Sequence, residues 1–108
     1  MITFENLKFE THPNISGAFS ANLNLPNGLF VSVISGDGAY SSKDTYEIAM
    51  FWQGDFIQLG AYDDVLGYQS KEQIDEILRK AQDDLVSFLS ECQQRKELAK
   101  QLSSLNHG

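Results

Sequence analysis

The stretch from Ser70 to Leu105, SKEQIDEILRKAQDDLVSFLSECQQRKELAKQLSSL, decides the fold, because its apolar residues recur at helical spacing throughout. Ser70 and Gln73 match the capping box that begins many helices. Lys96 and Lys100 lie toward the opposite end, where the helix dipole favours basic residues. The sequence therefore predicts one long C-terminal helix over residues 70–105.

The apolar residues of this helix form two stripes. At about 100° per residue, the first set lies within roughly 60° of one line, a width that suits a helix packed on a sheet. Its members are Ile74, Ile77, Leu78, Ala81, Leu85, Phe88, Leu89 and Cys92. Leu98, Leu102 and Leu105 form a narrower stripe centred roughly 110° away. A straight helix cannot turn both stripes toward one sheet.

The predicted helix is also longer than the sheet is wide, since about 35 residues at ~1.5 Å each exceed the ~24 Å of five adjacent strands. The chain can bend between Gln93 and Lys96. Residues 93–105 can instead project and bury the second leucine stripe against another molecule, which would make a homodimer. Fraying is the third outcome, because Ser103 and Ser104 are poor helix formers.

Up to about Ala61 the apolar pattern has period two and is interrupted by turn residues, which predicts an antiparallel meander of about five strands. Pro26-Asn27-Gly28 and Gly54-Asp55 are the clearest hairpin signals. Apolar residues between Leu29 and Ile34 fall on both faces, so we expect this strand to be covered at least partly on each side. Residues 62–69 have the composition of a turn-rich connector.

The predicted class is therefore α+β, with an antiparallel meander of about five strands covered on one face by a long C-terminal helix. All 108 residues belong to one domain, divided into a sheet (1–61), a connector (62–69) and the helix (70–105). At the N-terminus, Ile2 and Phe4 are out of phase with Leu7 and Phe9. The first strand should then contain a bulge or begin only near Asn6.

The acidity of the chain is concentrated in its first two thirds. The net charge is −7; residues 1–69 hold eight acids and two bases, and residues 70–108 hold seven acids and six bases. Direct nucleic-acid binding is not expected, because it requires clustered Lys and Arg. An acidic surface can steer a basic protein partner, or it can serve solubility alone. With one cysteine, no signal peptide and no span of ~20 apolar residues, we expect a cytoplasmic protein.

No residue pattern in the chain matches a catalytic or metal site. The Gly36–Asp44 loop lacks the spacing of a phosphate-binding or calcium loop. His12 and His107 lie in a turn and near the C-terminus, and Cys92 belongs to the apolar seam of the helix. We therefore expect no enzymatic activity, no metal and no cofactor.

Exposed acids and aromatic residues are the candidates for partner contact, because Tyr gives much contact area at small entropic cost. Tyr46 and Trp52 are expected in the core. The partner-binding candidates are Asp37, Tyr40, Asp44, Asp55, Tyr62, Asp63, Asp64 and Tyr68.

Four short motifs carry a resemblance to a known group. They are Pro26-Asn27-Gly28, Ser32-Val33-Ile34-Ser35-Gly36, Tyr46-Glu47-Ile48-Ala49 and Asp63-Asp64-Val65-Leu66-Gly67-Tyr68. In this order they resemble small uncharacterised proteins of tailed phages and prophages over roughly residues 20 to 80, although the helix after Ala81 is longer here. The resemblance implies a phage protein in bacterial cytoplasm, where small acidic proteins often bind and block a host machine.

The sequence thus favours an acidic binding protein that inhibits or modulates a host or defence complex, for example in the manner of an anti-CRISPR protein. The partner surface would be basic, as in nucleic-acid-handling complexes. An alternative is a structural or assembly protein that self-associates through Leu98, Leu102 and Leu105. A third class, a small-ligand or hydrolytic protein that uses the Gly36–Asp44 loop, requires a cleft beside that loop.

Overall fold

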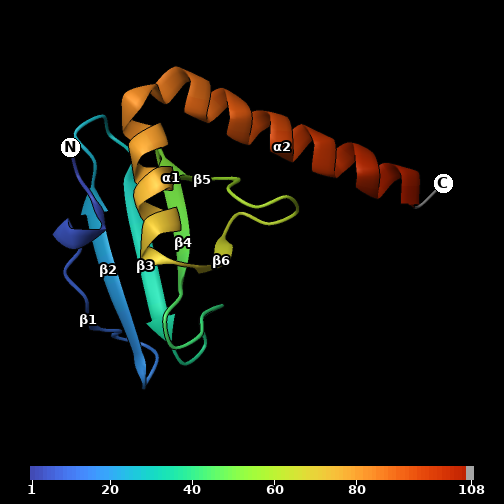
Figure 1. Ribbon diagram of the computed structural model, residues 1–108. Coiled ribbons are helices and arrows are strands. Elements are labelled where there is room, and N and C mark those ends of the chain that lie inside the picture. Colours follow the sequence, from blue (N-terminus) through green and yellow to red (C-terminus); the bar gives the residue numbers. More distant parts are fainter. Residues whose placement is uncertain (107–108) are drawn as a thin grey trace.

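The computed structural model describes residues 1–106, and side chains up to residue 105. It contains an antiparallel sheet and two C-terminal helices, which confirms the predicted α+β class (Figure 1). The strands are β1 (Glu10–Thr11), β2 (Ala18–Asn24), β3 (Phe30–Gly36), β4 (Tyr46–Trp52), β5 (Asp55–Ile57) and β6 (Leu66–Gln69). They follow one another in the order β1-β2-β3-β4-β5, with β6 also paired to β4.

Strands β5 and β6 share one edge of β4. Ile57 of β5 pairs with Met50 of β4. Leu66 of β6 pairs with Ile48 of β4, two residues before Met50 in the sequence. The eight residues 58–65 therefore form a loop inserted into what would otherwise be one continuous edge strand. The prediction that residues 62–69 are only a connector was wrong, because the chain returns to β4 as β6.

The N-terminal segment packs against the first helix instead of forming a long strand. Residues Phe4–Asn6 form the 3₁₀ helix η1, and β1 begins at Glu10, later than either sequence alternative. The main-chain nitrogen of Phe4 donates to Asp75 Oδ1 at 2.6 Å, and Gln82 exchanges two hydrogen bonds with the main chain of Ile2. These hydrogen bonds pair the main-chain N–H groups of Ile2 and Phe4, which in a strand would pair with a neighbouring strand.

Helix α1 (Lys71–Asp83) covers one face of the sheet and forms the core with it (Figure 1). It begins with the predicted capping box, in which Gln73 N donates to Ser70 Oγ at 3.1 Å. Ile74, Leu78 and Ala81 are fully buried. They belong to one core cluster with side chains of the covered face, including Val31, Val33, Ile48 and Met50.

The predicted single helix is broken at Asp84, where α1 ends and α2 (Leu85–Asn106) begins. Asp84 has extended backbone, and its Oδ1 accepts a hydrogen bond from Ser87 N at 3.1 Å, the pattern of an N-cap. The break has a simple physical cause. Thirteen helical residues rise ~20 Å, about the length of a seven-residue strand, so a longer straight helix would leave the sheet.

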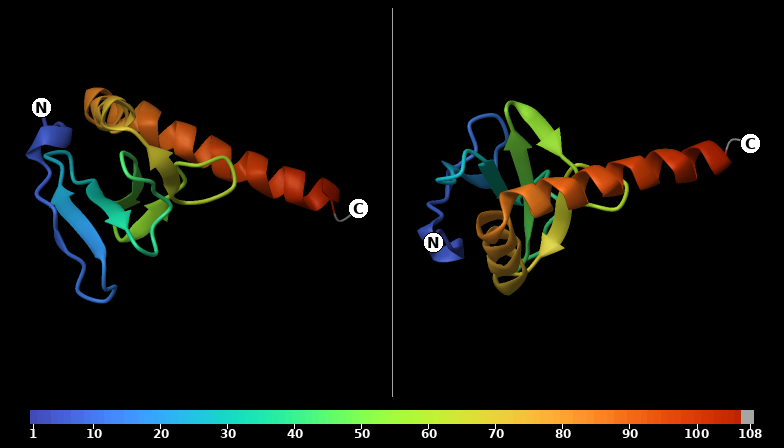
Figure 2. Two further views of the ribbon diagram at one scale, coloured as in Figure 1. Left: turned by 60° about the horizontal axis from the view of Figure 1, so that its bottom comes forward. Right: turned by 90° about the horizontal axis from the view of Figure 1, so that it is seen from above.

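Helix α2 runs without interruption from Leu85 to Asn106, which excludes the alternative of a bend between Gln93 and Lys96. Its first turns bury Phe88 and Cys92 in the core cluster. The remainder extends away from the sheet, and the end of α2 lies far from the body (Figures 1 and 2). We call residues 93–106 the arm.

The Asp84 cap makes stability depend on pH. Hydrogen bonds from the Ser87 backbone and then its side chain lower the pKa of Asp84 below its ordinary value. A lowered folded-state pKa gives stabilisation that is complete above the unfolded-state value of about 3.9 and is lost as pH falls through the folded value. We expect Asp84→Asn to melt at a lower temperature than the wild type near pH 7. The gap should shrink as pH falls from 7 through the lowered pKa of Asp84, because protonation makes its side chain neutral like that of asparagine. Thermal melts across an acid pH series check this; a gap that stays constant down to the most acidic pH at which both proteins fold would contradict it.

Candidate functional site

The inserted loop of residues 58–65 has a defined geometry. Leu59 N donates to Asp64 O at 3.2 Å, and Gly60 N donates to Asp63 O at 3.0 Å, so the loop closes on itself as a tight hairpin. Asp63 Oδ1 accepts from Asp64 N at 2.8 Å and fixes the tip. Tyr62 at the tip is 74% exposed. The loop therefore presents an aromatic ring and an acid on an ordered turn.

Helix α2 clamps the base of this loop. The buried side chain of Gln58 donates to the main-chain oxygens of Gly60 and Ala61 at 3.1 Å and to that of Arg95 at 3.4 Å. In return, Arg95 Nε donates to Gln58 O at 3.0 Å. The reciprocal bonds fix where Tyr62 lies relative to α2.

Removing the clamp should loosen the loop. We expect Arg95→Met to lower the hydrogen-exchange protection of the Leu59 and Gly60 amides about tenfold, equivalent to ~1.4 kcal/mol for a charged donor lost to a main-chain carbonyl. The matched control is Lys96→Met, which removes a neighbouring exposed charge and should leave both amides unchanged. Equal exchange in the two variants would mean that Arg95 does not hold the loop.

Tyr40 and Tyr68 come from different segments but lie side by side. Tyr68 N donates to Tyr40 O at 2.8 Å, and Tyr40 N donates to Glu47 Oε2 at 2.8 Å. A Cβ on Gly67 would lie 2.5 Å from the Tyr40 Cβ, so only glycine permits this approach. Tyr68 has a φ of 54°, which is uncommon outside glycine. Both tyrosine rings are largely exposed.

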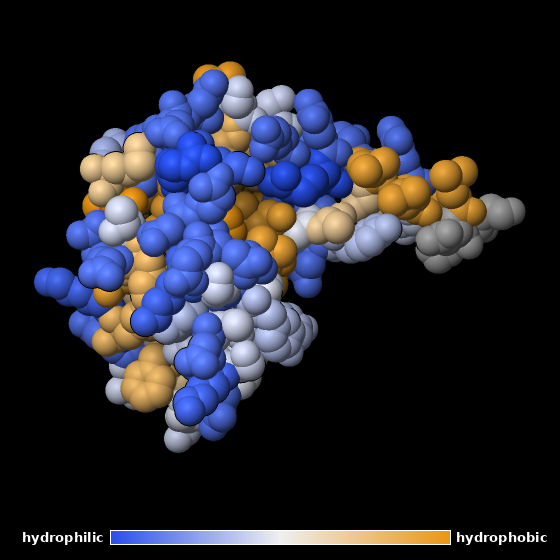
Figure 3. Space-filling model, viewed as in Figure 1, coloured by the Kyte–Doolittle hydropathy of each residue, from blue (hydrophilic) through white to orange (hydrophobic). Residues whose placement is uncertain are grey.

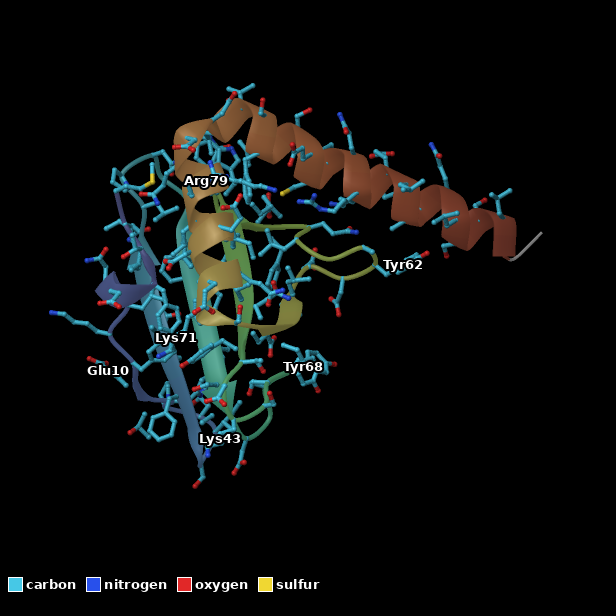
Figure 4. The ribbon with its side chains drawn as sticks, in the orientation of Figure 1. Glu10, Lys43, Tyr62, Tyr68, Lys71 and Arg79 are labelled. Atoms are coloured by element: carbon cyan, nitrogen blue, oxygen red, sulfur yellow. The ribbon has the colours of Figure 1, made fainter. Side chains whose placement is uncertain are left out.

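The predicted contact residues are only partly brought together. Tyr62 and Tyr68 project from the same side of the molecule (Figure 4). With Tyr40, Asp63 and Asp64 they form what we call the loop edge. Asp44 is exposed in the loop that also carries Tyr40.

Two of the predicted acids lie apart from the loop edge. Asp37 lies against Gly17, where its Oδ2 occupies the space that a Cβ would need. Asp55 pairs with Trp52 beside the turn between β4 and β5, at the far end of β4 from Tyr68. Neither acid is included in the loop edge.

The other groups considered from sequence have structural surroundings. His12 Nδ1 accepts from Asn14 N at 3.1 Å within a turn, and His107 lies outside the described residues. Cys92 is buried, and this burial raises the pKa of its thiol, whereas a nucleophilic cysteine needs a lowered one. A cavity of about 340 Å³ adjoins Cys92 between α2 and β5, lined by Trp52, Phe56 and Leu89 among others. Within residues 1–106, no three His, Cys, Asp or Glu side chains gather as a metal site would require.

A second surface was missed by the sequence reasoning. The sheet face opposite α1 has no described helix over it, since α1 and α2 lie on the other side (Figure 2). The prediction that β3 is covered at least partly on both faces agrees with the partial burial of Phe30, Ser32 and Ile34, although no helix supplies the cover on this face. Cross-strand pairing aligns Phe30, Phe51 and Phe56 on this open face, with ring centroids 5.8 and 4.3 Å apart. We call these three residues the phenylalanine row.

The arm carries a third exposed surface. Leu98 and Leu105 are 55% and 74% exposed, and Leu102 is half-buried. Apolar side chains are visible on the projecting end of the molecule (Figure 3). In the part of the chain that the structure describes, Leu98 and Leu105 therefore stay largely open to solvent.

No family model, curated protein or solved structure matches the chain in the three comparisons made. Among the described residues, no helix is both long enough and apolar enough to cross a membrane.

Proposed function

We propose that this protein is a non-enzymatic binding protein whose loop edge engages a basic surface on a partner protein. The observation that carries the proposal is the ordered presentation of Tyr62 and Asp63 on a loop clamped by Arg95. An ordered loop loses little conformational entropy on binding, so its aromatic and acidic groups contribute more of their contact energy. Tyr40 and Tyr68 extend the same edge with two more exposed rings.

Charge supports the choice of a basic partner. Eight acids and two bases in residues 1–69 produce a field of one sign, which accelerates encounter with a positive surface. The absence of a metal-binding cluster in residues 1–106 and the raised pKa of the Cys92 thiol favour binding over catalysis as the role of the site.

The resemblance to tailed-phage and prophage proteins suggests the setting. In bacterial cytoplasm the partner would be a host or defence complex with a basic, nucleic-acid-handling surface, such as a CRISPR effector, which this protein would inhibit or modulate. A structural or assembly role through the arm is the second candidate, favoured by the exposure of Leu98 and Leu105.

The test is a pull-down from bacterial lysate at low salt, with mass spectrometry of the bound proteins. Three baits are compared: the wild type, Asp63→Asn/Asp64→Asn, and a control in which the exposed Glu72 and Glu91 become Gln. Both double variants remove two negative charges, and asparagine can still accept the hydrogen bond that fixes the loop tip. We expect a partner with the wild type and the control but not with the loop variant. Equal recovery by all three baits, or by none, would contradict the proposal.

A further inference from the structure

The open face of the sheet carries few charges in a chain whose net charge is −7. Side chains on this face from β1 to β5 are Glu10, Ala18, Ser20, Asn22, Asn24, Phe30, Ser32, Ile34, Glu47, Ala49, Phe51 and Phe56, as the strand register fixes. The two charges are Glu10, on the edge strand β1, and Glu47, whose Oε2 already accepts from Tyr40 N. Depletion of charge together with aromatic enrichment is typical of the core of a protein interface.

The row lies beside a hollow of about 350 Å³ lined by Asn24, Gly28, Phe30, Phe51, Gln53 and Gly54. Phe56, on strand β5, is 48% exposed at the end of the row. An apolar side chain from another molecule could enter this hollow without displacing a charge.

The arm matches the phenylalanine row in length and is opposite in charge to the rest of the chain. It carries Arg95, Lys96 and Lys100 against Glu97, a net charge of +2, while the rest of the chain holds five bases and fourteen acids. Its leucine stripe from Leu98 to Leu105 rises ~10 Å along the helix. The phenylalanine row has about the same length, since its ring centroids are 5.8 and 4.3 Å apart.

The leucine stripe of the arm does not lie on the open face of its own chain, because α2 is continuous and leads away on the side of the sheet that carries α1 (Figures 1 and 2). Only the start of the arm, at Gln93 and Lys96, adjoins Phe56 at the edge of the sheet. Pairing of two arms with each other is disfavoured, since both are positive and each offers only three leucines, too few for a stable pair of isolated helices. A positive arm is instead attracted to the acidic body of another copy.

We propose that two copies of this chain exchange arms, so that Leu98, Leu102 and Leu105 of each copy pack on the phenylalanine row of the other. Each copy gives one arm and receives one, which closes the assembly as a dimer. The leucines and phenylalanines of this contact are not residues of the loop edge, so variants of the one can be tested without changing a residue of the other.

The test is sedimentation equilibrium of variants, alone and mixed. The arm variant is Leu98→Glu/Leu105→Glu, and the face variant is Phe56→Glu. We expect the wild type to move from 12.1 kDa toward twice that mass as concentration rises, and each variant alone to remain monomeric. An equimolar mixture of the two should regain a dimer, because one arm and one face remain intact and can meet.

Matched controls place the same new charge elsewhere. Val86→Glu lies on α2 outside the arm, and Phe19→Glu lies on the opposite face from the row; both residues are exposed, and both variants should dimerise as the wild type does. If circular dichroism finds Phe56→Glu unfolded, Asn24→Lys serves as the face variant, since Asn24 is exposed beside the same hollow.

Three results would overturn the proposal. A wild-type chain that stays monomeric up to about 0.5 mM would leave no dimer to explain. A face variant that still dimerises alone would point to pairing of arms. Masses that rise beyond twice the monomer would mean that the contact does not close.

Discussion

Replacing Leu78 by Ala should destabilise the protein by about 2–5 kcal/mol, the range measured for fully buried leucines in other proteins. Leu78 has no exposed surface and lies between α1 and the covered face of the sheet. Since small domains unfold with only about 5–15 kcal/mol, the variant would lose a large part of its stability.

Urea unfolding followed by circular dichroism measures this loss, with Val86→Ala as the matched control. Val86 is on α2 and almost fully exposed, so its truncation should change the free energy of unfolding by less than about 0.5 kcal/mol. A cost below about 1 kcal/mol at Leu78 would mean that α1 does not pack on the sheet as described.

Replacing Gly36 by Ala should have the second large effect, about 2–4 kcal/mol from left-handed strain plus a steric clash. Gly36 has a φ of +90°, and an added Cβ would lie 2.4 Å from the main-chain oxygen of Gly17. Because the obstacle is main chain of the neighbouring strand region, no side chain can move to relieve it.

Gly54→Ala separates the two contributions. Gly54 also has a positive φ, +88°, but a Cβ there would have no atom within 4 Å. We expect this variant to lose only the conformational part, about 1 kcal/mol. Equal unfolding free energies for the two variants would contradict the close approach of β2 and β3 at Gly36.

The meander of β2 to β5 and the start of α1 could be predicted from the sequence because their signals are local. Period-two alternation and turn residues indicated the strands, and Ser70 with Gln73 marked the cap. The break at Asp84 was not predicted, because apolar periodicity shows which side chains face the core and does not show whether they belong to one helix or to two. Ile74 and Cys92 both face the core in the structure, although they belong to different helices. The signal that could have found it was Asp84 itself, a preferred N-cap residue three positions before Ser87.

The surfaces were harder to predict because they depend on pairing between distant segments. Phe30, Phe51 and Phe56 form a row only in the observed register, and the sequence gives no direct measure of register. Tyr40 and Tyr68 were singled out as exposed rings, but their proximity depends on β6 returning to β4 and on Gly67. A projecting arm was one of the predicted alternatives, because a straight helix that packs its first apolar stripe on the sheet turns the leucine stripe away from it.

Binding of a basic partner at the loop edge predicts how the affinity for the partner recovered in the pull-down depends on the charges of Asp63 and Asp64. Titration calorimetry would compare the wild type with Asp63→Asn/Asp64→Asn and with Glu72→Gln/Glu91→Gln. We expect the loop variant to weaken the Kd at least about tenfold, or ~1.4 kcal/mol, and the control to change it less than about twofold. A Kd that both variants leave unchanged, or weaken equally, would contradict a binding site at the loop edge.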